Sequence, residues 1–165
     1  MAEFKSSHRV EGNVLCVSLE GLIDEDSLFP KLDVTGVTAM RLNLSGVKSI
    51  NSIGIREWLD WIRPLSEKLQ ITLEQCPKAL VFQFNMVEGF LPPRSSVRSF
   101  QVPFFCEKCD REQDFLFTVG KEIVAQAGKI VFNFDPKAAA SCTKADCEMQ
   151  PDVTEAKYFQ FLTKI

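Results

Sequence analysis

The chain has 165 residues, of which 45% are hydrophobic and 25% are charged, with a net charge of −3 and a mean hydropathy of −0.01. These values are typical of a globular protein of about one domain, and they do not fit a disordered or a membrane-embedded chain. The isoelectric point of about 5.3 gives no general attraction to nucleic acid or to an anionic membrane, so we expect proteins as partners.

The first predicted elements are two strands with a short helix between them. Residues 13–21 alternate apolar side chains in the manner of a strand with a buried face. In residues 22–32, Asp26 or Ser27 is suited to cap a short helix. Residues 38–47 form the second expected strand, which ends at a serine–glycine pair.

The most regular pattern is a helical one over residues 54–69, where apolar side chains recur every three or four positions and charged ones take the opposite side. Pro64 should kink or restart this helix, because proline removes a hydrogen bond and clashes with the preceding turn. We then expect a strand over 70–76, a helix over 77–89 and a strand over 95–105. This alternation predicts an α/β fold with a mainly parallel sheet and helices packed on it.

The junction between the second strand and the long helix reads LNLSGVKSINSIGIREWL, residues 42–59. A strand that ends in LSGV, followed by a polar residue, serine, one residue and glycine at the start of a long helix, resembles the STAS domain. That domain is found in bacterial anti-sigma-factor antagonists and in the tails of sulfate transporters. LEGLIDEDS, residues 19–27, is also similar to the first strand and turn of the family. The resemblance covers about residues 10–102, and we place a STAS-like regulatory domain at residues 1–102.

The resemblance also implies a regulated serine. In the switch proteins of the family, the serine of this turn is phosphorylated by a partner anti-sigma factor or a related serine kinase. Ser52 matches that phosphoacceptor and Gly54 matches the glycine after it, whereas Asn51 stands where aspartate is common and Ile53 where a second hydroxyl residue is frequent. We therefore expect regulatory phosphorylation at Ser52 and partner binding by Asn51, Gly54 and Arg56.

The physical chemistry of a helix start is compatible with two roles for Ser52. Unpaired N–H groups and the positive end of the helix dipole would tolerate a phosphate, which Arg56 could reach from one turn further on. The phosphate would add about −1.5 to −2 charges and repel an apolar or acidic docking surface. Serine is also a preferred N-cap, worth about 1 kcal/mol. A plain helix cap is therefore the alternative, and the two roles can coexist.

Four of the six cysteines form two pairs in the C-terminal part. Cys106 and Cys109 have the spacing C-x2-C, and Cys142 and Cys147 have the spacing C-x4-C. Such pairs are typical of structural zinc sites, in which four thiolates leave no coordination position for catalysis. We expect one structural zinc ion in a zinc-ribbon-like domain at residues 103–165, with thiols that hold no metal, or disulfides, as the alternative.

The rest of this part is predicted to be β-rich. Residues 114–120 and 129–136 alternate apolar and polar side chains and are expected to form a hairpin of the ribbon. Residues 156–165 should add a terminal strand or a short helix that covers it.

The remaining residues favour a non-enzymatic protein in a reducing compartment. Residues 1–13 contain no apolar segment of the kind that directs secretion, so we expect a cytoplasmic protein without a membrane segment. His8 is the one histidine, and no catalytic serine, histidine and acid set can be built around it. Cys16 and Cys76 lie in apolar strands and are predicted to be core residues.

The expected function is therefore a regulatory protein–protein interaction module that is switched at Ser52. The expected partner is an anti-sigma factor or a serine kinase-like regulator, and no nucleic acid partner is expected. A scaffold or a small-ligand-binding STAS-like protein without a switch is the alternative. Trp58 and Trp61 share one side of the long helix and are expected to pack in the core, or to dock a partner where they are exposed.

Overall fold

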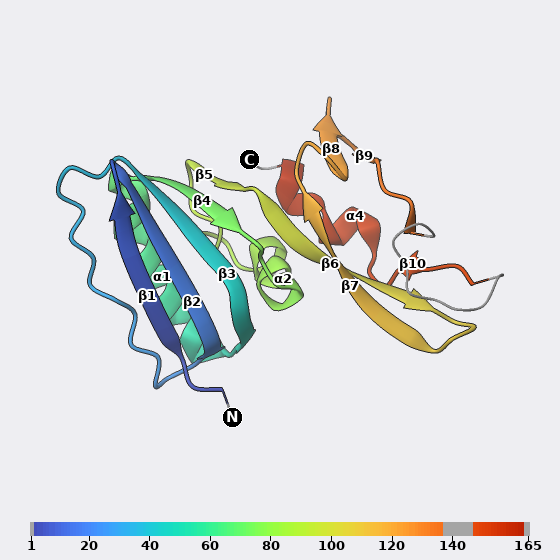
Figure 1. Ribbon diagram of the computed structural model, residues 1–165, viewed down its shortest axis with the longest axis horizontal. Coiled ribbons are helices and arrows are strands. Elements are labelled where there is room, and N and C mark those ends of the chain that lie inside the picture. The colour runs from blue at the N-terminus through green and yellow to red at the C-terminus, as the bar shows by residue number, and fades with distance from the viewer. Residues whose placement is uncertain (1, 137–146, 164–165) are drawn as a thin grey trace.

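The computed structural model describes residues 2–136 and 147–163 (Figure 1). It is a mixed α/β structure with two larger helices, α1 (Ser52–Lys68) and α2 (Lys78–Met86). The strands are β1 (Lys5–Glu11), β2 (Val14–Ile23), β3 (Ala39–Ile50), β4 (Gln70–Glu74), β5 (Ser95–Val97), β6 (Ser99–Cys106), β7 (Arg111–Thr118), β8 (Ile123–Gln126), β9 (Lys129–Phe132) and β10 (Gln150–Pro151). The α4 helix (Glu155–Tyr158) and the 3-10 helix η1 (Gln160–Thr163) follow. The predicted α/β class is therefore confirmed at this coarse level.

The N-terminal part is one five-stranded sheet with the strand order β1-β2-β3-β4-β5. Strand β1 is antiparallel to β2, and the other neighbours are parallel. Parallel neighbours need a crossover connection, and α1 and α2 lie in two of these crossovers. The register places Val17 beside Leu42 and Leu42 beside Leu73, so the buried side chains of neighbouring strands line up on one face.

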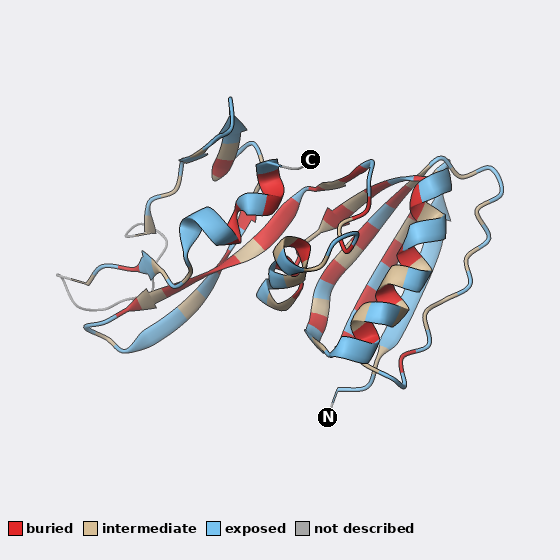
Figure 2. Cartoon of the chain, turned by 180° about the vertical axis from the view of Figure 1, so that it is seen from behind, coloured by how far each residue is buried: buried red, intermediate tan, exposed pale blue. Residues whose placement is uncertain are grey.

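Helix α1 lies along that face, and Figure 2 shows its outer side exposed. Trp58 and Ile62 are fully buried against the sheet, and Trp58 Nε1 donates a hydrogen bond to the carbonyl oxygen of Phe90 at 2.9 Å. Trp61 is half-buried and donates to the carbonyl oxygen of Pro30, also at 2.9 Å. The predicted long helix is confirmed, and it continues through Pro64 to Lys68 without a restart.

The short helix that we expected in residues 22–32 is absent from the structure, so this prediction is wrong. Ser27 instead closes a turn, because its Oγ accepts from the N–H of Asp24 at 2.9 Å and donates to the carbonyl oxygen of Leu22 at 3.1 Å. Pro30 follows too soon for a helix to propagate from this turn. Phe29 packs against both tryptophans of α1 in place of a helical stripe.

Two features at the sheet edges were not expected from the sequence. Residues 5–11 form the edge strand β1, although the segment is polar and all of its residues are exposed. The strand expected over 95–105 is divided at Arg98, where the chain leaves the first sheet as β5 and enters a second sheet as β6. The backbone N–H of Arg98 donates to the carbonyl oxygen of Leu73 in β4 at 2.8 Å, and this hydrogen bond keeps the two sheets adjacent.

The C-terminal part is built on the antiparallel β6–β7 hairpin, with β10 paired to the other edge of β6. The hairpin predicted between residues 114–120 and 129–136 is wrong in its pairing. Strand β7 pairs with β6, and β9 pairs with β8. A tight turn after Cys106 lets β7 fold back on β6 at once, and a second short turn lets β9 fold back on β8, so each strand pairs with its neighbour in the sequence. The helical alternative for the predicted C-terminal segment is the one observed, as α4 and η1.

Buried aromatic side chains continue from one part of the chain to the other. Phe100 of β6 contacts Phe117 of β7 and Phe161 of η1, at ring-centroid distances of 6.3 and 5.1 Å. Asn85 of α2 also donates to the carbonyl oxygen of Tyr158 at 2.8 Å and accepts from the N–H of Phe161 at 2.9 Å. The boundary expected between residues 102 and 103 lies inside β6, and the division into two domains stays a prediction.

In the part of the chain that the structure describes, none of the helices combines the length and the apolar character needed to cross a membrane.

Candidate metal centre and Ser52 turn

Two of the predicted metal ligands lie at the tip of the β6–β7 hairpin. Cys106 is the last residue of β6 and pairs with Arg111, the first residue of β7. The intervening turn brings Cys109 back beside Cys106. Asp110 completes the reversal with a φ of 51°, in the left-handed region that aspartate enters more readily than most side chains.

The third ligand reaches the same place through β10. Gln150 pairs with Phe105 and Pro151 pairs with Phe104 in antiparallel register. Residues before Gln150 therefore run toward the hairpin tip, and three residues earlier the chain reaches Cys147. Figure 1 shows β10 beside the hairpin, on the side away from the five-stranded sheet.

The sulfur atoms of Cys106, Cys109 and Cys147 all lie within 4.8 Å of one another. Cys106 is buried, whereas Cys109 and Cys147 are half-buried. The sulfur atoms of Cys109 and Cys147 lie 2.9 Å apart. A zinc ion bound to thiolates at about 2.3 Å would hold its sulfur ligands roughly 3.8 Å apart in a tetrahedron, so small side-chain adjustments suffice. The three cysteines can therefore hold one metal ion. The fourth predicted ligand, Cys142, lies outside the described residues.

A small aromatic cluster lies beneath this part of the hairpin. The rings of Phe104, Phe115 and Phe134 contact one another at centroid distances between 5.1 and 5.4 Å. Aromatic contacts of this kind stabilise a core, but a module of this size buries little apolar surface on its own. A bound metal would link Cys147 to the hairpin and so add to the stability of this part.

The Ser52 turn has a different cap from the one expected. Asn51 is the N-cap of α1, and its Oδ1 accepts a hydrogen bond from the N–H of Gly54 at 2.8 Å. Ser52 is the first helical residue, so the interpretation of Ser52 as the cap is wrong. Asparagine and serine are about equally good caps, and the sequence pattern cannot choose between two adjacent candidates.

Ser52 and Arg56 are both exposed on the first turns of α1. The Ser52 hydroxyl makes no hydrogen bond, and Arg56 makes no ion pair, with any residue that the structure describes. Asn51 also donates from Nδ2 to the carboxylate of Glu25 at 2.8 Å, and this hydrogen bond holds the pKa of Glu25 below its usual range. An acidic side chain thus lies beside the residue that precedes Ser52.

Gly54 is buried and packs against the end of β2. A Cβ atom added to Gly54 would lie 2.2 Å from the carbonyl oxygen of Ile23, far inside any allowed contact. The same carbonyl accepts from the N–H of Asn51 at 3.1 Å. The glycine that was expected to bind a partner therefore has a clear packing role, which fixes α1 against β2.

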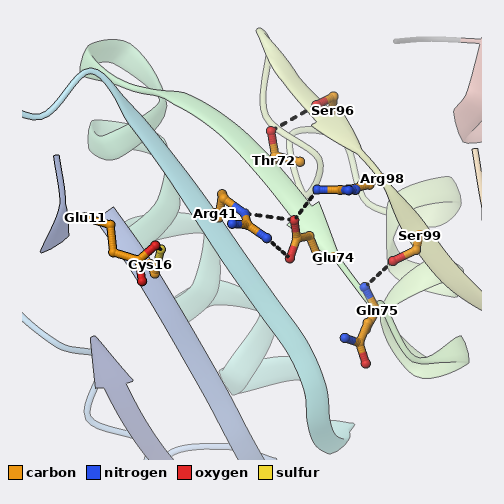
Figure 3. A network of polar contacts seen from close by, with 9 residues as sticks. All are labelled: Glu11, Cys16, Arg41, Thr72, Glu74, Gln75, Ser96, Arg98 and Ser99. Carbon is orange, nitrogen blue, oxygen red and sulfur yellow. Dashed lines mark hydrogen bonds and ion pairs between the residues drawn. The ribbon is translucent and has the colours of Figure 1, made fainter. Parts of the chain in front are cut away.

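The face of the sheet opposite α1 carries a polar network that sequence reasoning missed (Figure 3). Glu74 accepts from Arg41 Nε at 3.0 Å and from one terminal nitrogen of Arg98 at 3.3 Å. The side chain of Glu74 is 13% exposed, so the pairs are partly shielded from water. Polar residues in alternate positions of β3 were the available signal. The partners come from β3, from β4 and from Arg98 between β5 and β6, and they cannot be matched without knowing how these segments pair.

The two remaining cysteines differ in environment. Cys76 is fully buried, which confirms its predicted place in the core, and burial raises the pKa of its thiol. Cys16 is half-exposed on the open polar face, with its sulfur 3.8 Å from a carboxylate oxygen of Glu11. The prediction that Cys16 is a core residue is therefore wrong, because it occupies the polar side of the β2 alternation.

Comparison of the chain with protein-family models, curated proteins and solved structures found no match.

Proposed function

We propose that the protein is a non-catalytic regulatory module that binds a protein partner through the Ser52 turn and is released by phosphorylation of Ser52. The partner would be an anti-sigma factor or another serine kinase-like regulator, as the resemblance of residues 42–59 to STAS domains implies. The protein would act in the cytoplasm, where thiols stay reduced.

The observation that carries this proposal is that the Ser52 hydroxyl is exposed at the first position of α1 and is not needed as the cap. Phosphorylation would therefore leave the hydrogen bond between Asn51 and Gly54 in place. The added charge, about −1.5 to −2, would lie at the positive end of the helix dipole and within one turn of Arg56. The fold would tolerate the phosphate, and the main effect would be on the docking surface.

The cysteine cluster would have a supporting role in this proposal. Cys106, Cys109 and Cys147, together with Cys142, would hold one structural zinc ion. Four thiolates saturate a tetrahedral ion, which leaves no position for water or substrate. The metal would contribute folding free energy to residues 99–163 and no chemical step.

Replacement of Ser52 by aspartate tests the switch. Ser52→Asp should abolish binding to the partners that wild-type protein captures from its host, whereas Ser52→Ala should retain them. Ser49→Asp is a matched control, because Ser49 is an exposed serine at the end of β3 and its replacement adds the same charge. Binding that is unchanged by Ser52→Asp would contradict the switch and favour the scaffold or small-ligand alternative.

A further inference from the structure

Strand β1 is the edge of the five-stranded sheet. Among residues 2–136 and 147–163, β2 pairs with one side of β1 and no strand pairs with the other. All seven residues of β1 are exposed. An edge strand of this kind presents a row of backbone N–H and C=O groups that can pair with another strand.

The neighbouring connection, residues 24–38, passes on the outer side of β1 in Figure 1, and its Phe29 contacts Phe4, the residue before β1, at a ring-centroid distance of 5.0 Å. It is attached to α1, through the hydrogen bond between Pro30 and Trp61 and through the ring contacts of Phe29. No backbone hydrogen bond links it to the outer side of β1 in the described part of the chain. The exposure of Val10, at 54%, also indicates that this connection leaves the strand accessible.

The charges along β1 distinguish between the ways in which two copies could pair. In an antiparallel pair with two-fold symmetry, one residue must face its own counterpart. When His8 is that residue, all seven positions overlap and Lys5 faces Glu11 of the second copy, so that two opposite-charge pairs form. When Ser7 is central, Lys5 faces Arg9 of the second copy. When Arg9 is central, Arg9 faces Arg9 of the second copy. Both registers place like charges opposite each other. Only in the register centred on His8 do all seven residues of both β1 strands pair while the charged residues that face each other attract.

We propose that two copies of this chain associate through their β1 edges in the antiparallel register centred on His8. Charged residues on an edge strand commonly prevent unselective pairing. Here they disfavour the registers centred on Ser7 and Arg9. The register centred on Val10 places Arg9 opposite Glu11, but it pairs only residues 9–11 of β1, whereas the His8-centred register pairs the whole strand. The contact is small, so the dimer is a weak one that forms as the protein concentration rises.

The proposed pairing joins two five-stranded sheets into one continuous sheet. A two-fold axis perpendicular to the sheet keeps both α1 helices on the same face and both polar networks on the other. The two Ser52 turns are then presented on one side of the dimer, which suits a partner with two docking sites.

Sedimentation velocity of the whole protein over a wide range of concentrations measures the association. Lys5→Glu and Glu11→Lys each turn two attractive pairs into repulsive ones, and each should raise the dimer dissociation constant by about tenfold or more. The double variant Lys5→Glu/Glu11→Lys restores opposite charges and should return the dissociation constant to near the wild-type value. Lys129→Glu, which makes the same charge change at an exposed position of β9, should have no effect.

A second measurement tests the register. His8→Cys should form a disulfide between two copies under mild oxidation, and peptide mapping should locate it at position 8. Ser7→Cys faces Arg9 of the second copy and should cross-link far more slowly. Circular dichroism and thermal unfolding check that each variant is folded.

Several results would overturn the proposal. One is a wild-type protein that stays monomeric at every concentration. Another is a dimer whose dissociation constant is unchanged by both Lys5→Glu and Glu11→Lys. A third is a double variant whose dissociation constant does not return to near the wild-type value. A Lys129→Glu variant as weakened as Lys5→Glu would show a general charge effect instead, and faster cross-linking at position 7 than at position 8 would refute the register.

Discussion

Gly54 takes part both in the packing of α1 on β2 and in the cap of α1. Its backbone contacts Ile23, and its N–H donates to the capping side chain of Asn51. The resemblance to STAS domains implied that Gly54 is a partner-binding residue. The structure gives a physical reason for glycine at this position, since a methyl group would clash with the carbonyl oxygen of Ile23. The placement of Ser52 therefore depends on a close approach of helix and strand.

Gly54→Ala should destabilise the protein by about 3 kcal/mol or more, because the clash is with backbone atoms and α1 must move away from β2. Urea denaturation followed by tryptophan fluorescence measures the change. Gly36→Ala is the comparison, since Gly36 has a φ of 74° but open space around its Cβ position, so only conformational strain of about 1–2 kcal/mol is expected. Equal costs for the two variants would show that the close contact does not constrain α1.

At the Ser52 turn, the sequence predicts which residues start the helix but not which residue caps it. The positions of Ser52 and Arg56 on the first exposed turns of a helix follow from the change of period after residue 51. The choice of Asn51 over Ser52 as the cap does not, because both residue types accept the same hydrogen bond equally well.

Among the secondary-structure elements, those with a strong apolar periodicity were predicted correctly, and the polar strand β1 was missed. The apolar stripe of α1 and the alternation in β2 predicted both elements correctly. Strand β1 is polar on both faces, so no pattern marks it. It forms because the β1–β2 hairpin supplies its backbone hydrogen bonds.

The sequence also did not predict which strands pair with each other in the C-terminal part. Residues 129–132 pair with β8 and not with β7, and Cys147 reaches the hairpin tip only through the register of β10. The spacing of the cysteines predicted their proximity without that register, because metal coordination itself requires the ligands to converge. The cluster of Cys106, Cys109 and Cys147 could therefore be predicted even where the strand pairing could not.

The purified protein should contain about one zinc ion per chain. Cys147→Ser should lose the metal and increase hydrogen exchange over residues 150–163, because β10 and α4 follow directly after this ligand. Elemental analysis and exchange mass spectrometry make the two measurements. Cys16→Ser is the control, since Cys16 lies on the open face of the first sheet and should keep full metal content.

A metal-free wild-type protein in which residues 150–163 are well protected would contradict this role. Loss of metal from Cys16→Ser as well would show instead that the ion is bound without a defined site.

At the scale of the whole molecule, the proposed switch and the proposed metal site lie in different parts of the chain. Ser52 begins α1, which packs on the five-stranded sheet, and the cysteine cluster lies at the turn between β6 and β7. Figure 1 shows α1 and the tip of this hairpin at opposite sides of the molecule. The aromatic contacts of Phe100 and the hydrogen bonds of Asn85 connect the two parts. In the proposed function, the metal would therefore support the structure, while regulation would depend on the Ser52 turn.

Phosphopeptide mapping of the protein isolated from its native host tests the central claim most directly. The account predicts a phosphate on Ser52 in part of the population, and its loss after phosphatase treatment. The tryptic peptide that contains Ser52 also contains Ser49, so fragment ions must assign the position. A protein in which Ser52 carries no phosphate under any growth condition, with phosphatases inhibited during isolation, would contradict the regulatory switch.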